Sequence, residues 1–305
     1  MVWVPPRRNI KVRDHLPLRE WVAPLREICA RHALDARALA PFASGSDVVW
    51  CAGDVVIKLS TPAWSAQMES ERRALAHAAG RLSVATPRLL CHGELAGWPY
   101  IVMSRVAGAP LADVWPGLDA RDRRRLAREL GALLRELHAL GPCTPDDWPA
   151  FWSRCRTDLA RRHAEPDAPP ELVRAIEPFL AAQAELDGPE RLFLHTEYLD
   201  QHVLVDDARG RWEPVAVIDF ADTQTGPPWY DFAAPVEFVF RGERGLLRAF
   251  LGGYGVDPDG TDPERMLAWA LAHRLGRLAR MLEAVAPAAP RDLRALARLL
   301  YAVDA

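Results

Sequence analysis

The chain has 305 residues, a formal net charge of −3, and hydrophobic side chains at half of its positions. This length and apolar content are enough for two lobes, each with its own core. The charge balance argues against a nucleic-acid-binding protein, and no apolar run approaches the roughly 18–20 residues that cross a bilayer. Five scattered cysteines and the lack of an apolar leader predict a cytoplasmic protein with reduced thiols.

The first part of the chain combines strand and helix patterns. Periodicity predicts a helix, a two-stranded hairpin, a second helix and two more strands over residues 17–34, 47–51, 54–59, 64–80, 88–92 and 99–104. We therefore expect residues 1–104 to form a small sheet-plus-helix lobe and residues 105–110 to form a linker.

The rest of the chain, residues 111–305, is expected to be a mostly helical lobe. A leucine stripe predicts a long helix that begins after Asp119, with Asp119 and Asp122 as a capping pair. Further patterns predict a strand pair and three more helices over residues 203–206, 215–219, 244–254, 262–285 and 290–303. The expected fold class is α+β.

Lys58 is one of only two lysines among 38 basic residues. Strand alternation in VVIKLS puts its ammonium on the face opposite Ile57, where it could meet the phosphates of a nucleotide. A lone lysine on an edge strand more often reaches solvent. We nevertheless expect Glu71, on the helix that follows, to pair with Lys58, and Glu69 to pair with the arginines that follow it.

Five stretches resemble, in the correct order, the aminoglycoside phosphotransferase family of small-molecule kinases. They are VVIKLS, ESERRAL, TPRLLCHGELAGWPYIVMSRVAGAPL, LLRELHAL and AVIDFADTQTGPPWYDFA. The resemblance extends over about residues 40–255 and implies a protein-kinase-like two-lobe fold. It further implies ATP or GTP as phosphoryl donor, Mg²⁺ or Mn²⁺ as metal, and a small-molecule hydroxyl as acceptor.

The resemblance also implies residue roles. The positions that would bind the nucleotide are Lys58, Glu71, Ser44, Gly45, Ser46, Ser104 and Val106. Asp219 matches the metal-binding Asp. Asp231 matches an acid that supports the catalytic loop. Asp222 is expected either to contact the substrate or a metal-bound water, or to be an ordinary solvated acid.

The catalytic loop, FLHTEYLDQHVLVDD, departs from the family at two positions. Glu197 stands at the catalytic-base position, where the family has Asp, and His202 stands at the second metal position, where it has Asn. His195 matches the histidine of the loop and would brace the turn. Because imidazole suits Mn²⁺ better than Mg²⁺, His202 could bind a softer metal or contact a phosphate oxygen as a cation.

Three functions are compatible with this loop. The first is a phosphotransferase whose site is adapted to both substitutions. The second is a pseudokinase that binds nucleotide without turnover. The third is a metal-site enzyme that uses His195, Glu197 and His202 as a two-His-one-carboxylate set. The third leaves Lys58 and Asp219 unexplained.

The acceptor is not specified by the sequence. Acids that could face a polycationic acceptor are Asp158, Glu237, Glu243 and Asp262, and tryptophans that could stack on it are Trp148, Trp152, Trp229 and Trp269. Solvated acids and core aromatics are the plainer interpretation. Among the acceptors of the family, hygromycin-like aminocyclitols would be tested first. Activity on them would imply a role in antibiotic resistance. The sequence does not indicate whether the protein is a monomer or an oligomer.

Overall fold

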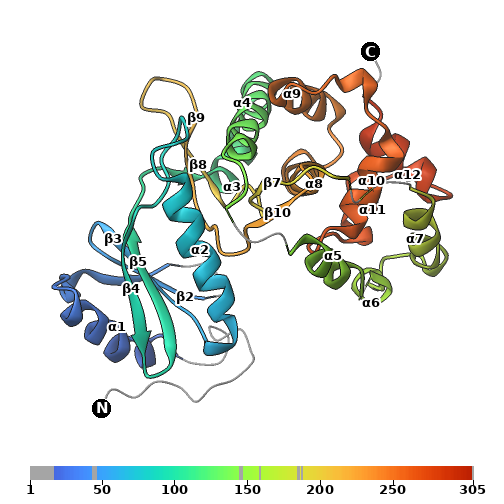
Figure 1. The fold of residues 1–305 in the computed structure, drawn as a ribbon. Helices are drawn as coiled ribbons and strands as arrows, with labels where there is room; N and C mark the ends of the chain where they lie inside the picture. Colours follow the sequence, from blue (N-terminus) through green and yellow to red (C-terminus); the bar gives the residue numbers. More distant parts are fainter. Residues whose placement is uncertain are drawn as a thin grey trace. The chain divides into compact units, whose positions relative to one another are not determined.

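The computed structural model describes residues 17–42, 47–143, 147–157, 159–183, 186 and 188–303. The chain forms two compact units (Figure 1). The first contains the residues up to Arg81 together with Ala85–Ala107 and Ile218–Asp222. The second contains Leu82–Val84, Gly108–Val217 and the residues from Thr223 onward. The short segment after Val217 therefore belongs to the first unit, although both of its neighbours along the chain belong to the second.

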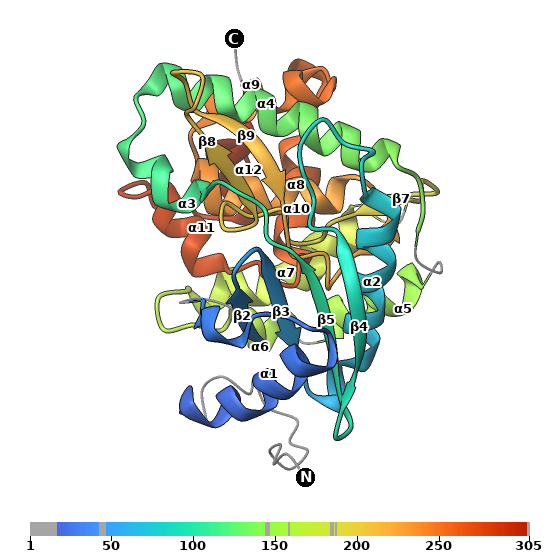
Figure 2. The same cartoon turned by 90° about the vertical axis from the view of Figure 1, so that its left-hand side faces the viewer.

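The first unit is built on a five-stranded antiparallel sheet in the order β1-β2-β3-β5-β4. Its strands are β1 (Leu39–Pro41), β2 (Val48–Ala52), β3 (Val55–Leu59), β4 (Leu89–Leu95) and β5 (Trp98–Ser104). Two helices accompany the sheet, α1 (Arg19–Arg31) and α2 (Ser65–Ala78). Figures 1 and 2 show α1 and α2 on opposite sides of it.

Alternation along β3 gives the sheet two different faces. Ile57 and Leu59 join Trp21 and Leu25 of α1 in a buried apolar cluster. Lys58 lies between Ile57 and Leu59 in the strand, so its side chain points to the other face. The same period of two that buries the core therefore presents one lysine away from it.

The second unit is mainly helical. Its helices are α3 (Leu111–Val114), α4 (Ala120–Ala139), α5 (Trp148–Thr157), α6 (Leu159–His163), α7 (Pro170–Ala182), α8 (Trp229–Pro235), α9 (Arg244–Tyr254), α10 (Pro263–Ala272), α11 (Leu278–Ala284) and α12 (Leu293–Tyr301). Asp119 caps α4 by accepting the backbone N–H of Asp122 at 2.8 Å, so one member of the expected capping pair supplies its side chain and the other its backbone.

Two small strand pairs of the second unit flank loops 195–202 and 218–223. β8 (Val203–Asp206) pairs antiparallel with β9 (Glu213–Val217), and β7 (Leu192–Leu194) pairs antiparallel with β10 (Gln224–Gly226). β6 (Ala109–Pro110) pairs with β8 and extends the first pair to three strands. Because Val203 is opposite Val217 and Leu194 is opposite Gln224, loops 195–202 and 218–223 leave the same strand ends.

The single helix predicted over 262–285 is wrong. The structure has two helices there, α10 and α11, with a break over residues 273–277. At His273 the backbone leaves the helical region (φ −57°, ψ 137°). A Cβ on Gly276 would lie 2.1 Å from the carbonyl oxygen of Ala270, so this close return of the chain requires glycine.

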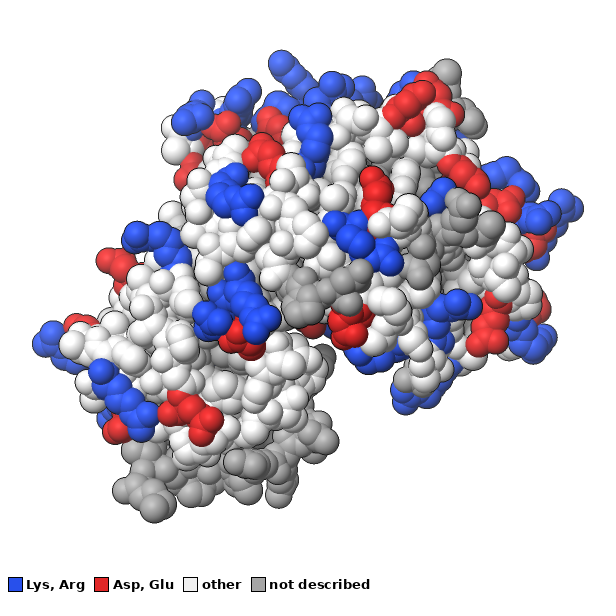
Figure 3. Space-filling view, viewed as in Figure 1, with Lys and Arg blue, Asp and Glu red and all other residues white. Residues whose placement is uncertain are grey.

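None of the helices in the described part of the chain is long and apolar enough to cross a membrane. On the face drawn in Figure 3, the coloured basic and acidic side chains lie interspersed rather than in one continuous patch. This distribution agrees with the small net charge of the sequence.

Candidate active site

The first unit gathers three carboxylates around one ammonium group. Nζ of Lys58 lies 2.9 Å from Oε2 of Glu71, 2.9 Å from Oδ1 of Asp219 and 3.5 Å from Oδ2 of Asp47. Asp47 is held in turn by the hydroxyl of Ser60, which donates to its Oδ1 at 2.7 Å. β3 supplies Lys58 and α2 supplies Glu71, as their spacing in the sequence predicts.

Burial determines the electrostatics of this cluster. Burial disfavours the charge on Lys58, but the carboxylates of Asp219, Glu71 and Asp47 outweigh it and raise the Lys58 pKa well above its ordinary value. The pKa of Glu71 is also raised, because burial and the two aspartates outweigh its attraction to Lys58. The cluster therefore carries an excess of negative charge around a lysine that stays protonated.

Glu69 does not compete for Lys58. Its carboxylate accepts from Nε of Arg72 at 2.7 Å and from Nε of Arg73 at 2.7 Å. These pairs lie on the partly exposed side of α2, whereas Glu71 is fully buried. The two glutamates, two positions apart, thus have the separate partners that the helix spacing predicts.

Asp219 has an unusual backbone conformation. Its φ is +64°, in the left-handed region that non-glycine residues rarely occupy. Such a conformation is costly and persists only where the surrounding structure enforces it. At Asp219 the ion pair with Lys58 belongs to that support, and the strained turn directs the carboxylate toward the ammonium.

In the second unit, Asp231 holds the backbone of the catalytic loop. This fully buried residue of α8 accepts the N–H groups of His195 and Thr196, both at 2.7 Å. It also accepts Nε2–H of His138 at 3.2 Å. Thr196 has a φ of +63°, so the carboxylate stabilises a strained loop residue directly before Glu197. His195 itself is fully buried, a position that suits a bracing role.

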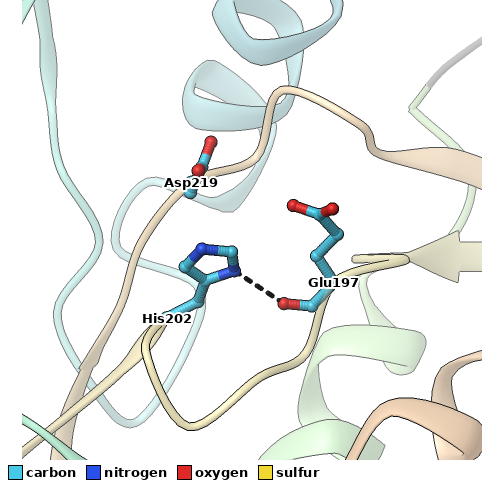
Figure 4. A group of neighbouring side chains, drawn as sticks. All are labelled: Glu197, His202 and Asp219. Carbon is cyan, nitrogen blue, oxygen red and sulfur yellow. Dashed lines mark hydrogen bonds between the residues drawn. The ribbon is translucent and has the colours of Figure 1, made fainter. Parts of the chain in front are cut away.

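His202 and Glu197 come from opposite ends of the same tight loop. Nδ1 of His202 lies 2.8 Å from the backbone oxygen of Glu197 (Figure 4). Because a carbonyl oxygen only accepts, Nδ1 carries the proton, and in the neutral ring the lone pair is then on Nε2. This hydrogen bond fixes both the orientation and the tautomer of the imidazole. Asp219, also labelled in Figure 4, belongs to the first unit.

Glu197 has a partner that the sequence did not indicate. Nη2 of Arg274 donates to its Oε1 in an ion pair that is 28% exposed at the arginine side chain and 17% at the glutamate. Arg274 lies in the break between α10 and α11. Its neighbour His273 is fully buried and donates Nε2–H to the backbone oxygen of Thr196 at 2.9 Å.

The other residues expected at the site have fewer described contacts that bear on nucleotide or substrate binding. Ser44, Gly45 and Ser46 lie outside the described residues. Ser104 ends β5, and its hydroxyl accepts the N–H of Arg88 at 2.9 Å. Val106 is partly buried just after that strand, and Asp222 is partly buried three residues beyond Asp219.

The tryptophans proposed as stacking surfaces are mainly core residues. Trp148, Trp152 and Trp269 are each at most 8% exposed. The ring centroids of Trp148 and Trp152 are 5.6 Å apart, and those of Trp152 and Trp269 are 5.0 Å apart. Their main contribution is to the packing of α5 against α10. Trp229 is partly buried and packs edge-on against Phe232.

The acids proposed to face a cationic acceptor have structural partners. Glu237 is buried and accepts from Nη1 of Arg280 at 2.5 Å. Asp262 caps α10 through the N–H of Glu264, and Glu243 lies 3.8 Å from Arg123. Asp158 lies outside the described residues. The three described acids therefore give no specific support to a polycationic acceptor.

Sequence reasoning missed two residues with direct contacts at these groups. Asp47 was predicted only as the first residue of a strand over residues 47–51, although it lies beside Lys58. Arg274 was placed inside a continuous helix. The available signal was Gly276, which lowers helix propensity two residues further on.

Comparison with known proteins identifies the family. The phosphotransferase enzyme family matches residues 38–269. A curated relative, the lysine-specific demethylase JMJ21 of Arabidopsis thaliana, is 26% identical over 204 residues. That alignment covers 52% of this chain and 22% of the relative, so the chain spans about a fifth of that protein's length.

Solved structures agree in fold. Aminoglycoside phosphotransferase APH(3'')-Id from Streptomyces rimosus, in complex with ADP and streptomycin, has a TM-score of 0.65 and 19% identity, covering 84% of this chain and 98% of that one. The GDP complex of wild-type aminoglycoside 2'-phosphotransferase-IIIa has a TM-score of 0.63 and 17% identity, covering 82% and 87%.

These matches confirm the expected α+β, protein-kinase-like fold. The expectation of a phosphotransferase enzyme is confirmed at the level of the family, since the family match covers more than half of the chain and includes both Lys58 and Asp231. The chain belongs to the phosphotransferase enzyme family.

Proposed function

We propose that this protein transfers the γ-phosphoryl group of ATP or GTP to a hydroxyl group of a small polar molecule. The observation that carries the proposal is the buried Lys58, held between Glu71 and Asp219. A protonated lysine fixed by a helix carboxylate is the arrangement that kinase-like enzymes use to hold nucleotide phosphates. Complexes of the solved relatives with ADP and GDP support nucleotide binding here.

In this proposal, Lys58 neutralises phosphate oxygens, and Glu71 keeps its ammonium in place. Asp219 would hold a divalent cation through its carboxylate. The bound cation would neutralise charge on the β- and γ-phosphates. The excess of carboxylate around Lys58 supports this role, because three acids and one lysine leave room for additional positive charge.

His202 and Asp219 are the proposed metal ligands. They are paired in this proposal because the family resemblance implies a metal-binding role for both residues. The donor chemistry fits a divalent cation, because Asp219 offers a carboxylate oxygen and the His202 tautomer offers Nε2. One imidazole in this set favours Mn²⁺ over Mg²⁺ relative to an all-oxygen site.

Glu197 is the proposed catalytic base. As the acceptor oxygen forms its bond to the γ-phosphorus, the bond to the leaving nucleoside diphosphate breaks, and the hydroxyl proton passes to the Glu197 carboxylate. Asp231 accepts the N–H groups of the two residues before Glu197, and Arg274 forms an ion pair with the Glu197 carboxylate. These contacts would hold the base in position.

Aminoglycosides remain the first acceptors to test, because the solved relatives include a complex with streptomycin. Hygromycin-like aminocyclitols belong to the same group. The structural partners of Glu237, Glu243 and Asp262 make neutral polyhydroxylated molecules an equal second group.

The decisive experiment measures the unfolding temperature with ATP or GTP, each with Mg²⁺, Mn²⁺ or EDTA. We expect stabilisation that needs metal, equivalent to about 2.7 kcal/mol at a hundredfold excess of nucleotide over Kd. An acceptor screen for nucleoside diphosphate release follows. An Asp54→Ala variant, altered at an exposed hairpin acid, serves as control.

Three results would change the proposal. Metal-independent stabilisation, with no turnover on any acceptor, would favour a nucleotide-binding pseudokinase. Iron that co-purifies, with oxygen uptake and no response to nucleotide, would favour the His195, Glu197 and His202 metal enzyme. If neither nucleotide changes the unfolding temperature, both the phosphotransferase hypothesis and the pseudokinase hypothesis are contradicted.

A further inference from the structure

The break between α10 and α11, residues 273–277, contacts the catalytic loop at two residues, Thr196 and Glu197. His273 donates Nε2–H to the backbone oxygen of Thr196 at 2.9 Å and accepts the N–H of Leu275 on Nδ1 at 3.2 Å. Burial, together with the charge of Arg274, lowers the pKa of His273 to about 3. Its ring is therefore neutral at ordinary pH, and both hydrogen bonds keep their direction.

The backbone of Arg274 is also held. Its N–H donates to the hydroxyl of Tyr230 at 3.2 Å. Tyr230 is fully buried and directly precedes Asp231, which accepts the N–H groups of His195 and Thr196. The same short stretch of α8 therefore anchors both the catalytic loop and the backbone from which Arg274 extends.

The break is specific in shape. Because Gly276 returns so close to Ala270 that no side chain fits, the end of α10 and the start of α11 take one arrangement. The next turn is fixed from α6, where His163 accepts the N–H of Leu278 on Nδ1 at 3.0 Å and lies 2.9 Å from the oxygen of Leu271. This geometry gives the arginine side chain a defined starting point.

The guanidinium of Arg274 binds Oε1 of Glu197 from this fixed base. A guanidinium has a planar set of donors, so it restricts the direction of a carboxylate more than a flexible ammonium does. The pair is mostly shielded from solvent, which reduces screening of the interaction.

We propose that Arg274 is the positioning residue of the catalytic base. It holds the Glu197 carboxylate in the orientation in which it accepts the proton of the acceptor hydroxyl. This inference rests on the proposed function of the site and adds a residue to it. It also accounts for Glu at this position, because an Asp side chain is shorter by one C–C bond, roughly 1.5 Å, and would not reach the same guanidinium from the same loop.

The test compares Arg274→Gln and Arg274→Lys with a matched control, Arg277→Gln. Arg277 lies in the same break with similar side-chain exposure, 32% against 28%, but its Nε is 3.4 Å from Glu165. The assay is metal-dependent nucleoside diphosphate release, with water or the best screened hydroxyl compound as acceptor. Unfolding temperatures are measured in parallel.

We expect Arg274→Gln to lower kcat by ~10- to 100-fold, since a misplacement of about 1 Å has effects of this size. The KM for nucleotide should stay within about twofold, because Lys58 and Glu71 are unchanged. Arg274→Lys should recover part of kcat, and added guanidinium ion should partly restore Arg274→Gln. Arg277→Gln should keep the parental kcat.

The possible failures are distinguishable. If Arg274→Gln keeps the parental kcat while Lys58→Ala abolishes turnover, the positioning role is wrong and the phosphotransferase proposal stands. If Arg274→Gln and Arg277→Gln both lose kcat and both unfold at a lower temperature, the break has only a structural role. The positioning role of Arg274 is then wrong as well. If the parent shows no metal-dependent turnover, the proposed function fails and the positioning role fails with it.

Discussion

The Lys58 cluster and the catalytic loop are organised in different ways. In the first, charged side chains hold one another: Lys58 lies within 3.5 Å of three carboxylates. In the second, backbone groups are held: Asp231 accepts two N–H groups of the loop, and His273 donates to one of its carbonyl oxygens. The first arrangement controls charge, and the second controls the position of Glu197.

This difference predicts different responses to mutation. Removing a charge from the Lys58 cluster should change what the protein binds and how fast it reacts. Removing a partner of the loop should also cost stability, because buried backbone donors lose their acceptor. The four predictions below test this contrast, from the largest expected effect to the smallest.

Asp219→Ala should lower phosphoryl transfer by at least about a thousandfold, equivalent to about 4 kcal/mol, because the proposed metal site would lose its carboxylate ligand. Steady-state rates with Mg²⁺ and Mn²⁺ measure the effect. Asp54→Ala, at an exposed acid of the same unit, should keep the parental rate. A rate within tenfold of the parent would remove Asp219 from the metal site.

Asp231→Asn should lower the free energy of unfolding by about 3 kcal/mol, because an amide replaces a buried carboxylate that accepts three hydrogen bonds. Urea unfolding measures the change. Asp207→Asn, at an exposed turn residue, is the matched control and should be nearly neutral. A loss below about 1 kcal/mol would mean that the loop does not depend on this carboxylate.

His163→Gln should change how stability depends on pH. Burial lowers the pKa of His163 to about 4 from an ordinary 6.5, so the unfolded chain binds one more proton between these values. The parental free energy of unfolding therefore gains up to about 1.4 kcal/mol per pH unit from this residue as pH rises from 4 to 6.5.

Urea unfolding at four pH values between 4.5 and 7.5 gives the slope of the free energy of unfolding against pH for the parent and for the His163→Gln variant. For the His163→Gln variant, the rise in the free energy of unfolding per pH unit should be smaller by up to about 1.4 kcal/mol, the equivalent of one proton. This difference is independent of how stable the variant is at any single pH. Equal slopes for the parent and His163→Gln would show that His163 is not kept neutral by burial.

The double change Glu197→Asp with His202→Asn should lower the ratio of Mn²⁺- to Mg²⁺-supported rates by about tenfold, because an amide oxygen replaces the imidazole donor. Rates at saturating nucleotide with each metal give the ratio. His202→Asn alone separates the metal effect from that of the shorter base. An unchanged ratio would place His202 outside the metal site.

The sequence predicted much of the first unit because its signals are local. Period-two alternation placed Lys58, and helical spacing separated Glu71 from Glu69. The contact of Lys58 with Asp219, 161 residues away, was not predicted, because the family resemblance implied only a nucleotide-binding role for Lys58 and a metal-binding role for Asp219. In the second unit, the capping role of Asp119 was predicted in the same way, because a helix N-terminus has a compact local signature.

The second unit was predicted less completely. Asp231 accepts two N–H groups of the loop, and the supporting role that the resemblance implied for it stays a prediction. Arg274 was missed because it is 77 residues from Glu197 and lies in a break that helical periodicity conceals. The tryptophans proposed for stacking are mainly packing residues, since an aromatic side chain has the same composition signal in a core as at a surface.

Local sequence patterns specified most of the element types, the two faces of the β3 strand and the residue types available for chemistry. Only the tertiary structure decided the partners: Asp47 beside Lys58, Arg274 on Glu197, and His273 against Thr196. The reason is physical. Periodicity reports which side of its own element a residue faces, whereas an ion pair or buried hydrogen bond depends on which distant element packs against that side.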